Sequence, residues 1–208
     1  MWFWKKKFNN YPKFYNRYLE KIRDEGFSTN LVCFDLETTG LDYKTTEVLS
    51  FGGVQIKNSK IKTTDSLQCF FHSTSSLNQS TIIHEIIPHK DSKSIADQLP
   101  AILTFISNYR ILGHFVEFDV NIINRELKKI GLPKLRNPTL DTLKIALKYD
   151  GVHNIQYAKK DEYTLFSLAK RFELEMQHTH NALEDAYVTA LLYLHLQLKK
   201  SNRPYYSK

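Results

Sequence analysis

The 208-residue chain lacks long hydrophobic segments: no run of about 18 apolar residues occurs, so we expect no membrane-spanning helix. Its N-terminus has apolar residues before its basic ones and no cleavage site, unlike a secretory signal peptide. Cysteine is scarce, because Cys33 and Cys69 are the only two, and both lie in apolar, strand-like runs. We therefore expect free buried thiols in a reducing compartment and a cytoplasmic location.

Acidic residues are scarce at both ends of the chain, which has a formal net charge of +7. Residues 1–30 contain seven Lys or Arg and three Asp or Glu, and residues 199–208 contain four Lys or Arg and no acid. A basic end can attract a polyanion through electrostatics. It also favours solubility, so charge alone does not identify a partner.

The N-terminal segment, residues 1–29, is aromatic and basic. Pro12 can open a helix and Gly26 can end it, and between them the apolar residues follow helical spacing at Tyr15, Tyr18, Leu19 and Ile22. Further aromatic side chains precede this helix at Trp2, Phe3, Trp4 and Phe8. They either fold back onto their own domain or dock on a membrane surface or a partner.

The rest of the chain lacks internal repeats and changes from strand-like to helical patterns. Strands are expected at 30–36, 46–57, 60–72 and 110–114, with a strand or turn at 138–141 and a hairpin turn at Asn58-Ser59. Helices are expected at 94–109, where Pro100 can introduce a kink, and at 119–130, 142–149, 164–172 and 181–198. Antiparallel strands followed by alternating strands and helices predict an α/β fold, a mixed sheet with helices on its faces.

Two acids, Asp35 and Glu37, follow an apolar strand-like run and precede a Thr-Thr-Gly turn. Residues two apart on a strand share a face. Close carboxylates raise each other's pKa unless a cation lies between them, and Mg²⁺ and Mn²⁺ prefer such oxygen ligands. The alternative is a pair of solvated acids at an exposed strand end.

A third acid, Asp119, lies where the strand at 110–114 gives way to a helix, a place where sites collect in open α/β sheets. It can instead be the cap of that helix. Glu117, two residues earlier, is a rival ligand.

A fourth acid, Asp185, falls in the first turn of the last predicted helix. Asn181 and Glu184 have the spacing of a capping box. His180 lies in the loop before this helix and can swing over the acid, although a shared helical face is excluded because five residues place the side chains about 140° apart. The alternative is that His180 and His178 are ordinary loop histidines.

Together these segments form D-x-E, a distant Asp, and then H-x₄-D. Dispersed carboxylates and one histidine suit two-metal phosphodiester hydrolysis, in which two cations about 3.5–4 Å apart stabilise the attacking and leaving oxygens. A histidine with a pKa near neutrality can take the proton from the attacking water. The pattern needs no cysteine ligand, which argues against zinc.

These motifs resemble the DEDDh (DnaQ-like) 3′→5′ exonucleases, which include the epsilon subunit of bacterial DNA polymerase III and ribonuclease T. The first motif corresponds to residues 34–40, the second to 114–119 and the third to 180–186, while LDTLKIALKY at 140–149 resembles the segment between the last two. The resemblance covers an exonuclease domain at 30–198. It leaves an N-terminal extension at 1–29 and a basic tail at 199–208.

The resemblance implies a ribonuclease H-like fold with a five-stranded mixed sheet and two Mg²⁺ or Mn²⁺ ions. It implies that one metal is held by Asp35, Glu37 and Asp185, that the second contacts Asp35 and Asp119, and that His180 is the general base. Glu117 would point away from the metals. The residues implied to hold the terminal nucleotide are Thr38, Thr39, Leu41, His114 and Phe118.

Two positions depart from the family pattern. Phe115 stands where an asparagine usually follows the histidine of the second motif, which affects a polar contact to the substrate and not the metal site. Glu85 replaces the glycine of a His-Gly-Ile segment.

We therefore expect a metal-dependent 3′→5′ exonuclease that releases nucleoside monophosphates from a single-stranded or frayed 3′ end, acting in polymerase proofreading or repair. DNA is favoured as substrate, because DLETTG resembles the epsilon-type members. RNA trimming uses the same residues and is the first alternative. The second is a non-catalytic nucleic-acid-binding or replicase-docking subunit, and a polymerase partner that binds the aromatic N-terminal segment fits either.

Overall fold

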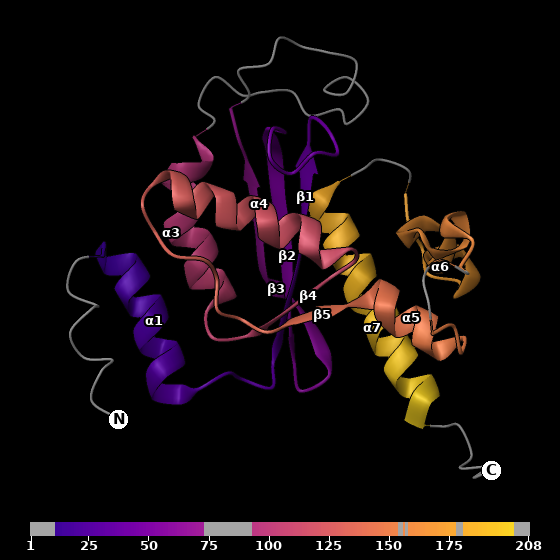
Figure 1. Cartoon of the computed structure of the whole chain (residues 1–208). Helices are drawn as coiled ribbons and strands as arrows, with labels where there is room; N and C mark the ends of the chain where they lie inside the picture. Colours follow the sequence, from indigo (N-terminus) through magenta and orange to yellow (C-terminus); the bar gives the residue numbers. More distant parts are fainter. Residues whose placement is uncertain (1–10, 73–92, 154–155, 157, 178–180, 202–208) are drawn as a thin grey trace.

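The computed structural model describes residues 11–72, 93–153, 156, 158–177 and 181–201 of the chain. Its centre is a five-stranded sheet with the order β3-β2-β1-β4-β5 (Figure 1). β1 pairs antiparallel with β2, and β2 with β3, whereas β4 runs parallel to both β1 and β5. The predicted α/β class and mixed sheet are therefore confirmed.

The strands are β1 (Leu31–Thr38), β2 (Val48–Lys57), β3 (Lys60–Phe70), β4 (Arg110–Gly113) and β5 (Thr139–Asp141). The helices are α1 (Lys13–Glu25), α3 (Ile95–Ile106), α4 (Val116–Lys129), α5 (Thr142–Tyr149), α6 (Leu165–Arg171) and α7 (Ala182–Ser201), and a short 3₁₀ helix spans Lys160–Tyr163. The turn between β2 and β3 is confirmed, because Asn58 and Ser59 have φ values of 52° and 57°. Two successive residues with positive φ match the right-handed twist of a tight hairpin.

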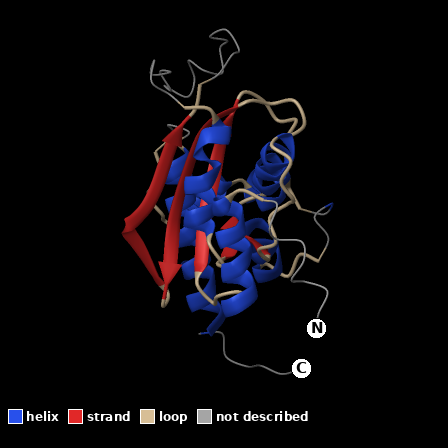
Figure 2. Ribbon diagram, turned by 90° about the vertical axis from the view of Figure 1, so that its left-hand side faces the viewer, coloured by secondary structure: helices blue, strands red, loops and turns tan. Residues whose placement is uncertain are grey.

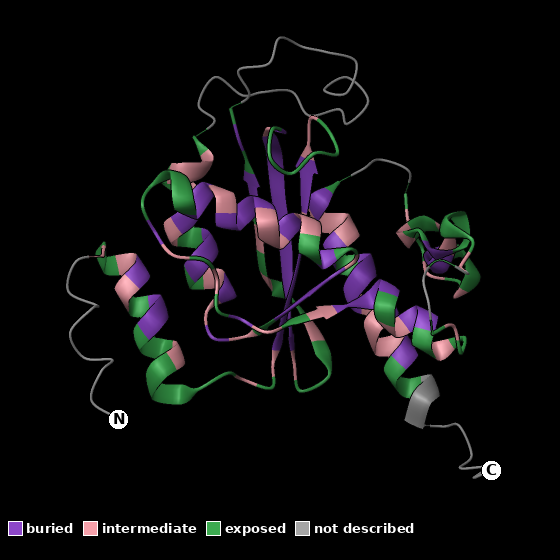
Figure 3. Ribbon diagram, in the orientation of Figure 1, coloured by how far each residue is buried: buried purple, intermediate pink, exposed green. Residues whose placement is uncertain are grey.

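The sheet buries both of its faces, and Figure 2 shows the strands as one layer with helices against it. Alternating residues of β1 divide between two hydrophobic clusters. Val32 and Phe34 join the main core beneath α1, α3 and α4. Leu31 and Cys33 face Ala186 of α7 on the other side. The central strands are consequently buried over most of their length (Figure 3).

The N-terminal helix α1 packs onto the main core. Tyr15, Tyr18 and Leu19 are buried there. The Tyr18 hydroxyl donates to Asn137 Oδ1 (2.7 Å) and accepts a hydrogen bond from the Arg136 backbone N–H (2.7 Å). The helix expected between Pro12 and Gly26 is confirmed. The aromatic residues Trp2, Phe3, Trp4 and Phe8 lie outside the described residues.

Several predicted boundaries were wrong by a few residues. α4 begins at Val116 instead of 119, because Phe115 takes a left-handed conformation and becomes its N-cap. α3 ends at Ile106 instead of 109, where Ser107 has a φ of 53°. Cys33 and Cys69 are free and buried, as expected. In the described part of the chain no helix is both long and apolar enough to cross a membrane.

Candidate metal centre and active site

The first two acids lie at the C-terminal end of the central strand. Asp35 is partly buried and Glu37 is only 7% exposed. Their alternation with Cys33 places both on the face of β1 that α7 covers. A register shift between Glu37 and Thr38 marks a bulge, which bends the strand where the acids emerge.

The start of α7 carries Asp185 to these acids. Asn181 caps the helix, because its Oδ1 accepts hydrogen bonds from the backbone N–H groups of Leu183 (3.0 Å) and Glu184 (3.4 Å). The Glu184 carboxylate accepts a hydrogen bond from the Gln177 N–H (2.6 Å), so it reaches further back along the chain than a capping box requires. Both contacts fix the helix start from which Asp185 projects.

Gly52 allows α7 to approach the sheet closely. It pairs with Asp35 across the β1–β2 ladder. A Cβ atom at this position would lie 2.0 Å from the Leu183 backbone nitrogen and 2.2 Å from the Ala182 carbonyl carbon. Only glycine, without a Cβ atom, permits α7 to lie this close to β2. The first turn of α7 therefore lies directly over the strand pair that carries Asp35.

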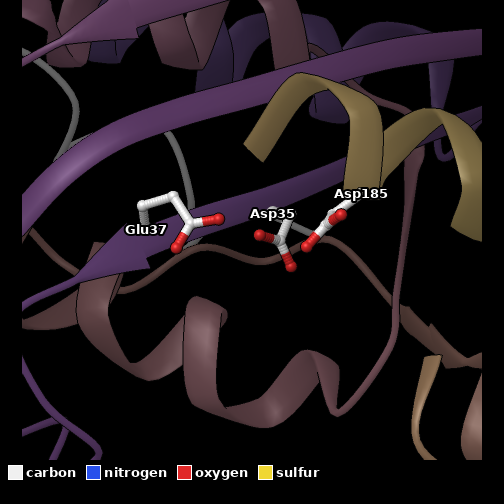
Figure 4. Close-up of side chains that lie close together, drawn as sticks. All are labelled: Asp35, Glu37 and Asp185. Carbon is white, nitrogen blue, oxygen red and sulfur yellow. The ribbon is translucent and has the colours of Figure 1, made fainter. Parts of the chain in front are cut away.

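Three of the predicted acids consequently meet. Asp35, Glu37 and Asp185 each offer a carboxylate oxygen, and these oxygens all lie within 4.8 Å of one another. Figure 4 shows the carboxyl groups of Asp35 and Asp185 side by side with Glu37 turned toward them. This spacing allows one cation to contact all three groups.

Asp119 joins the cluster from the opposite layer. It lies in the first turn of α4, is 4% exposed, and accepts a hydrogen bond from the Leu36 backbone of β1. The N-cap is Phe115, so the interpretation of Asp119 as a helix cap was wrong. Its charge raises the pKa of Asp35, so the two carboxyl groups are electrostatic neighbours.

The four acids repel one another strongly when no cation is bound. Burial, and then Asp119, Asp185 and Glu37, hold the pKa of Asp35 well above its ordinary value. Burial and Asp185 raise the pKa of Glu37 to about 8. Burial and Glu184 raise the pKa of Asp185 to about 7. At neutral pH this charge must be neutralised by protons or by cations.

The donor set fits a hard divalent ion. Every group in the cluster is a carboxylate, the ligand type that Mg²⁺ and Mn²⁺ prefer. Oδ1 of Asp185 is buried, and no hydrogen-bond donor among the described residues reaches it. Cys33 lies on the same face, where burial and the charge of Asp35 raise the pKa of its thiol.

Other candidates fall outside the cluster. Glu117 forms an exposed ion pair with Lys144 (2.8 Å), so it points toward α5 instead of competing as a ligand. His178 and His180 lie outside the described residues. The base expected next to Asp185 therefore stays a prediction.

Hydrogen bonds of its own polar groups hold the loop after β1 in place, and this loop exposes Leu41. Thr38 Oγ1 donates to the Gly40 carbonyl (2.8 Å), and Thr39 Oγ1 accepts a hydrogen bond from the Glu47 N–H (3.0 Å). Leu41 is 94% exposed. An apolar side chain displayed by an ordered loop beside the acids is suited to contact a substrate.

His114 is held by the protein on both ring nitrogens. Nδ1 contacts Thr142 Oγ1 (2.9 Å), and Nε2 donates to the Tyr163 carbonyl (3.0 Å). Burial lowers the pKa of His114 to about 4, so the ring is neutral at physiological pH. Both ring nitrogens of His114 are therefore engaged within the protein, and Phe118 is partly buried against the main core.

Sequence reasoning missed Asp141 and Gly52. Asp141 Oδ1 caps α5 by accepting from the Leu143 N–H (3.0 Å) and also accepts from the Phe115 N–H (3.1 Å), so it fixes the entry to α4. Asp141 lies where a strand gives way to a helix, and this position indicated that it caps the helix. The Gly52-Gly53 pair inside an apolar strand was a signal of close backbone approach.

A mixed sheet of this order with acids on its central strand defines a ribonuclease H-like fold. The chain belongs to the exonuclease family: the family model described as Exonuclease matches residues 32–193, and the resemblance to DnaQ-like exonucleases is confirmed. It is 30% identical to the DNA polymerase III subunit epsilon of Aquifex aeolicus over 84% of this chain and 83% of that protein. It is 35% identical to the PolC-type DNA polymerase III of Caldanaerobacter subterraneus over 78% of this chain, but spans only 11% of that protein.

Solved structures share the fold. Escherichia coli exonuclease I in complex with a dT13 oligonucleotide superposes with a TM-score of 0.67 and 17% identity, over 84% of this chain and 42% of that one. Exonuclease X in complex with 5′ overhanging duplex DNA superposes with a TM-score of 0.60 and 22% identity, over 83% of this chain and 94% of that one.

Proposed function

We propose that the chain is a 3′→5′ exonuclease that releases nucleoside 5′-monophosphates from single-stranded or frayed DNA 3′ ends and depends on Mg²⁺ or Mn²⁺. The observation that carries this proposal is the meeting of Asp35, Glu37 and Asp185, with a buried oxygen of Asp185 facing no donor in the described residues. Buried acids at this spacing destabilise the fold unless protons or cations neutralise their charge.

Each acid has a proposed role. Asp35, Glu37 and Asp185 would hold one ion, and Asp35 and Asp119 would contact a second. When bound, a metal pair stabilises the attacking and leaving oxygens of an in-line displacement. The protein supplies a rigid frame, because the ligands come from the central strand and from the first turns of α4 and α7.

The remaining residues would position the substrate and move the proton. His180 is proposed as the general base that takes a proton from the attacking water. Leu41 would lie beside the base of the terminal nucleotide. Thr38, Thr39, His114 and Phe118 would complete its pocket.

DNA is the proposed substrate because an epsilon subunit of DNA polymerase III is among the relatives and a fold neighbour was solved with a dT13 oligonucleotide. We propose an exonuclease domain at 30–198, flanked by an extension at 1–29 and a basic tail at 199–208. The epsilon-subunit and PolC-type relatives support the further proposal of a polymerase partner and of a proofreading or repair role. Aromatic residues before α1 are the proposed contact with that partner.

The test compares 5′-labelled DNA and RNA oligomers of matched sequence with Mg²⁺, Mn²⁺ or a chelator. We expect stepwise shortening from the 3′ end, faster on DNA, with nucleoside 5′-monophosphates as products and no reaction in chelator. Asp185→Asn is the inactive control. Faster shortening of RNA would identify an RNA-trimming enzyme instead, and no metal-dependent shortening of either strand would overturn the proposal.

A further inference from the structure

Phe115 is held in a left-handed backbone conformation near the acid cluster. Its φ and ψ are 58° and 37°, a region that bulky residues seldom adopt. Its N–H donates to Asp141 Oδ1 (3.1 Å), and its carbonyl accepts from the Phe118 N–H (2.9 Å). Strained residues that the surrounding structure fixes in this way concentrate at functional sites.

The ring of Phe115 does not belong to the core. The residue is 55% exposed, whereas Phe118 packs against the main core. An edge-to-face contact with the His114 ring, with centroids 5.8 Å apart and planes at 75°, supports it from one side. His114 is itself fixed by Thr142 and Tyr163. The result is a rigidly held aromatic ring with most of its surface open to solvent.

The position of this ring relates it to the acids. Phe115 is the N-cap of α4, and Asp119 lies in the first turn of the same helix. Asp141, which accepts the hydrogen bond of the Phe115 N–H, lies close enough to Asp119 to raise its pKa. Leu41, the other strongly exposed apolar residue near the site, follows the strand that carries Asp35 and Glu37. Two of the three acid-bearing segments, β1 and α4, are therefore each flanked by a strongly exposed apolar side chain.

We propose that Phe115 is a stacking surface for a base in the last two nucleotides of the 3′ end, an inference that rests on the proposed exonuclease function. Nucleobases stack on aromatic side chains whatever their sequence, because every base has a π-face. Phenylalanine carries no hydrogen-bonding side-chain group, so the contact accepts all four bases. It replaces the polar contact of the asparagine that usually stands at this position in the family.

The test measures kcat and KM for release of the 3′-terminal nucleotide from two oligomers, one ordinary and one with its last two nucleotides abasic. We expect Phe115→Ala to raise KM roughly tenfold on the ordinary oligomer and to leave KM unchanged on the abasic one. Phe115→Gly should do the same while folding normally, because glycine suits positive φ. Phe115→Trp should restore the wild-type KM.

Phe27→Ala is the matched control, since Phe27 is 42% exposed and precedes β1 at the end opposite the acids. It should leave KM unchanged on both oligomers. Equal KM changes for Phe115→Ala on the two oligomers, or none on the ordinary one, would overturn the inference while wild-type release upholds the proposed function. No release by the wild-type protein would overturn both.

Discussion

Gly52 and Leu183 are in direct backbone contact, so closely that a Cβ atom on Gly52 would lie 2.0 Å from the Leu183 nitrogen. We expect Gly52→Ala to push α7 off the sheet and to separate Asp185 from Asp35. Overpacking of this kind should lower the free energy of unfolding by about 3 kcal/mol and reduce the rate of nucleotide release. Denaturant unfolding and oligomer shortening measure the two effects.

Gly40→Ala is the control for stability, because a Cβ atom there meets only Thr46 Oγ1, at 3.8 Å. It should leave the unfolding midpoint unchanged. A Gly52→Ala protein with wild-type stability and activity would show that the close approach of α7 has no consequence for the site.

Replacing Asp35 should lower the activity of the protein and raise its stability. Asp35→Asn removes a buried carboxyl whose pKa is raised by burial and by three neighbouring acids. We expect nucleotide release to fall at least about a hundredfold, while the thermal midpoint in chelator at pH 8 rises. Asp65→Asn, in a half-buried pair with Lys57 on β2 and β3, far along the sequence from the acids, should change neither quantity. Undiminished release would refute the metal-site assignment.

The acid cluster should make the stability of the metal-free protein fall as pH rises. The pKa of Glu37 is raised to about 8 and that of Asp185 to about 7, above the roughly 4 of unfolded carboxyl groups. The native state therefore binds more protons than the unfolded chain in this window, and its stability is lost as pH climbs through it.

In chelator we expect a loss of roughly 2 kcal/mol or more of unfolding free energy between about pH 5 and pH 8. Added Mn²⁺ should abolish most of this loss, because a bound cation favours the charged carboxylates. Urea titrations at several pH values provide the measurement. A flat or rising stability curve in chelator would contradict the assignment.

Arg125 should position the loop that displays Leu41. Its Nη1 donates to the Tyr43 carbonyl (2.7 Å), and its guanidinium pairs with the buried Glu126 (2.6 Å). We expect Arg125→Ala to release the loop, raise KM for the oligomer several-fold and leave kcat nearly unchanged. Limited proteolysis near Tyr43 should become faster.

Lys144→Ala is the matched control for Arg125, since it breaks only the exposed pair with Glu117. It should leave KM and the proteolysis rate unchanged. Arg125→Lys keeps the charge but lacks the fork of donors, so it should restore KM only in part. Wild-type KM in Arg125→Ala would show that the loop keeps its position without the Arg125 contact.

Tyr18 should anchor α1 to the core. Tyr18→Phe removes the hydroxyl that donates to Oδ1 of the buried Asn137 and accepts from the Arg136 backbone N–H. We expect a loss of about 1–3 kcal/mol of unfolding free energy. Lys13→Ala, at the exposed start of the same helix, should have no such effect. Unchanged stability in Tyr18→Phe would show that the hydrogen bonds of this hydroxyl do not anchor α1.

Much of the fold and the meeting of three acids were predictable from the sequence because their signals are local. Asp35 and Glu37 end an apolar run, and Asp185 follows a capping asparagine. Alternation on β1 places the first two on one face. The resemblance to a known family predicted that these segments come together in the fold. Their spacing in the sequence alone does not predict it.

Other features depend on contacts between segments far apart in the sequence. Gly52 matters because α7 crosses it. The Gly52-Gly53 pair indicates a close approach, but it does not indicate which segment makes that approach. A phenylalanine does not predict a left-handed backbone conformation, which glycine or asparagine more often adopts. The start of α4 was therefore placed three residues late, and the exposed ring of Phe115 went unnoticed.

The order of the ligands along the chain has a consequence for synthesis. The central strand appears early, but α7, which carries Asp185 and packs on β1 and β2, is the last helix described. A chain still emerging from the ribosome cannot close the acid cluster until this helix has left the exit tunnel. The proposed metal site is therefore completed only after α7 has been synthesised.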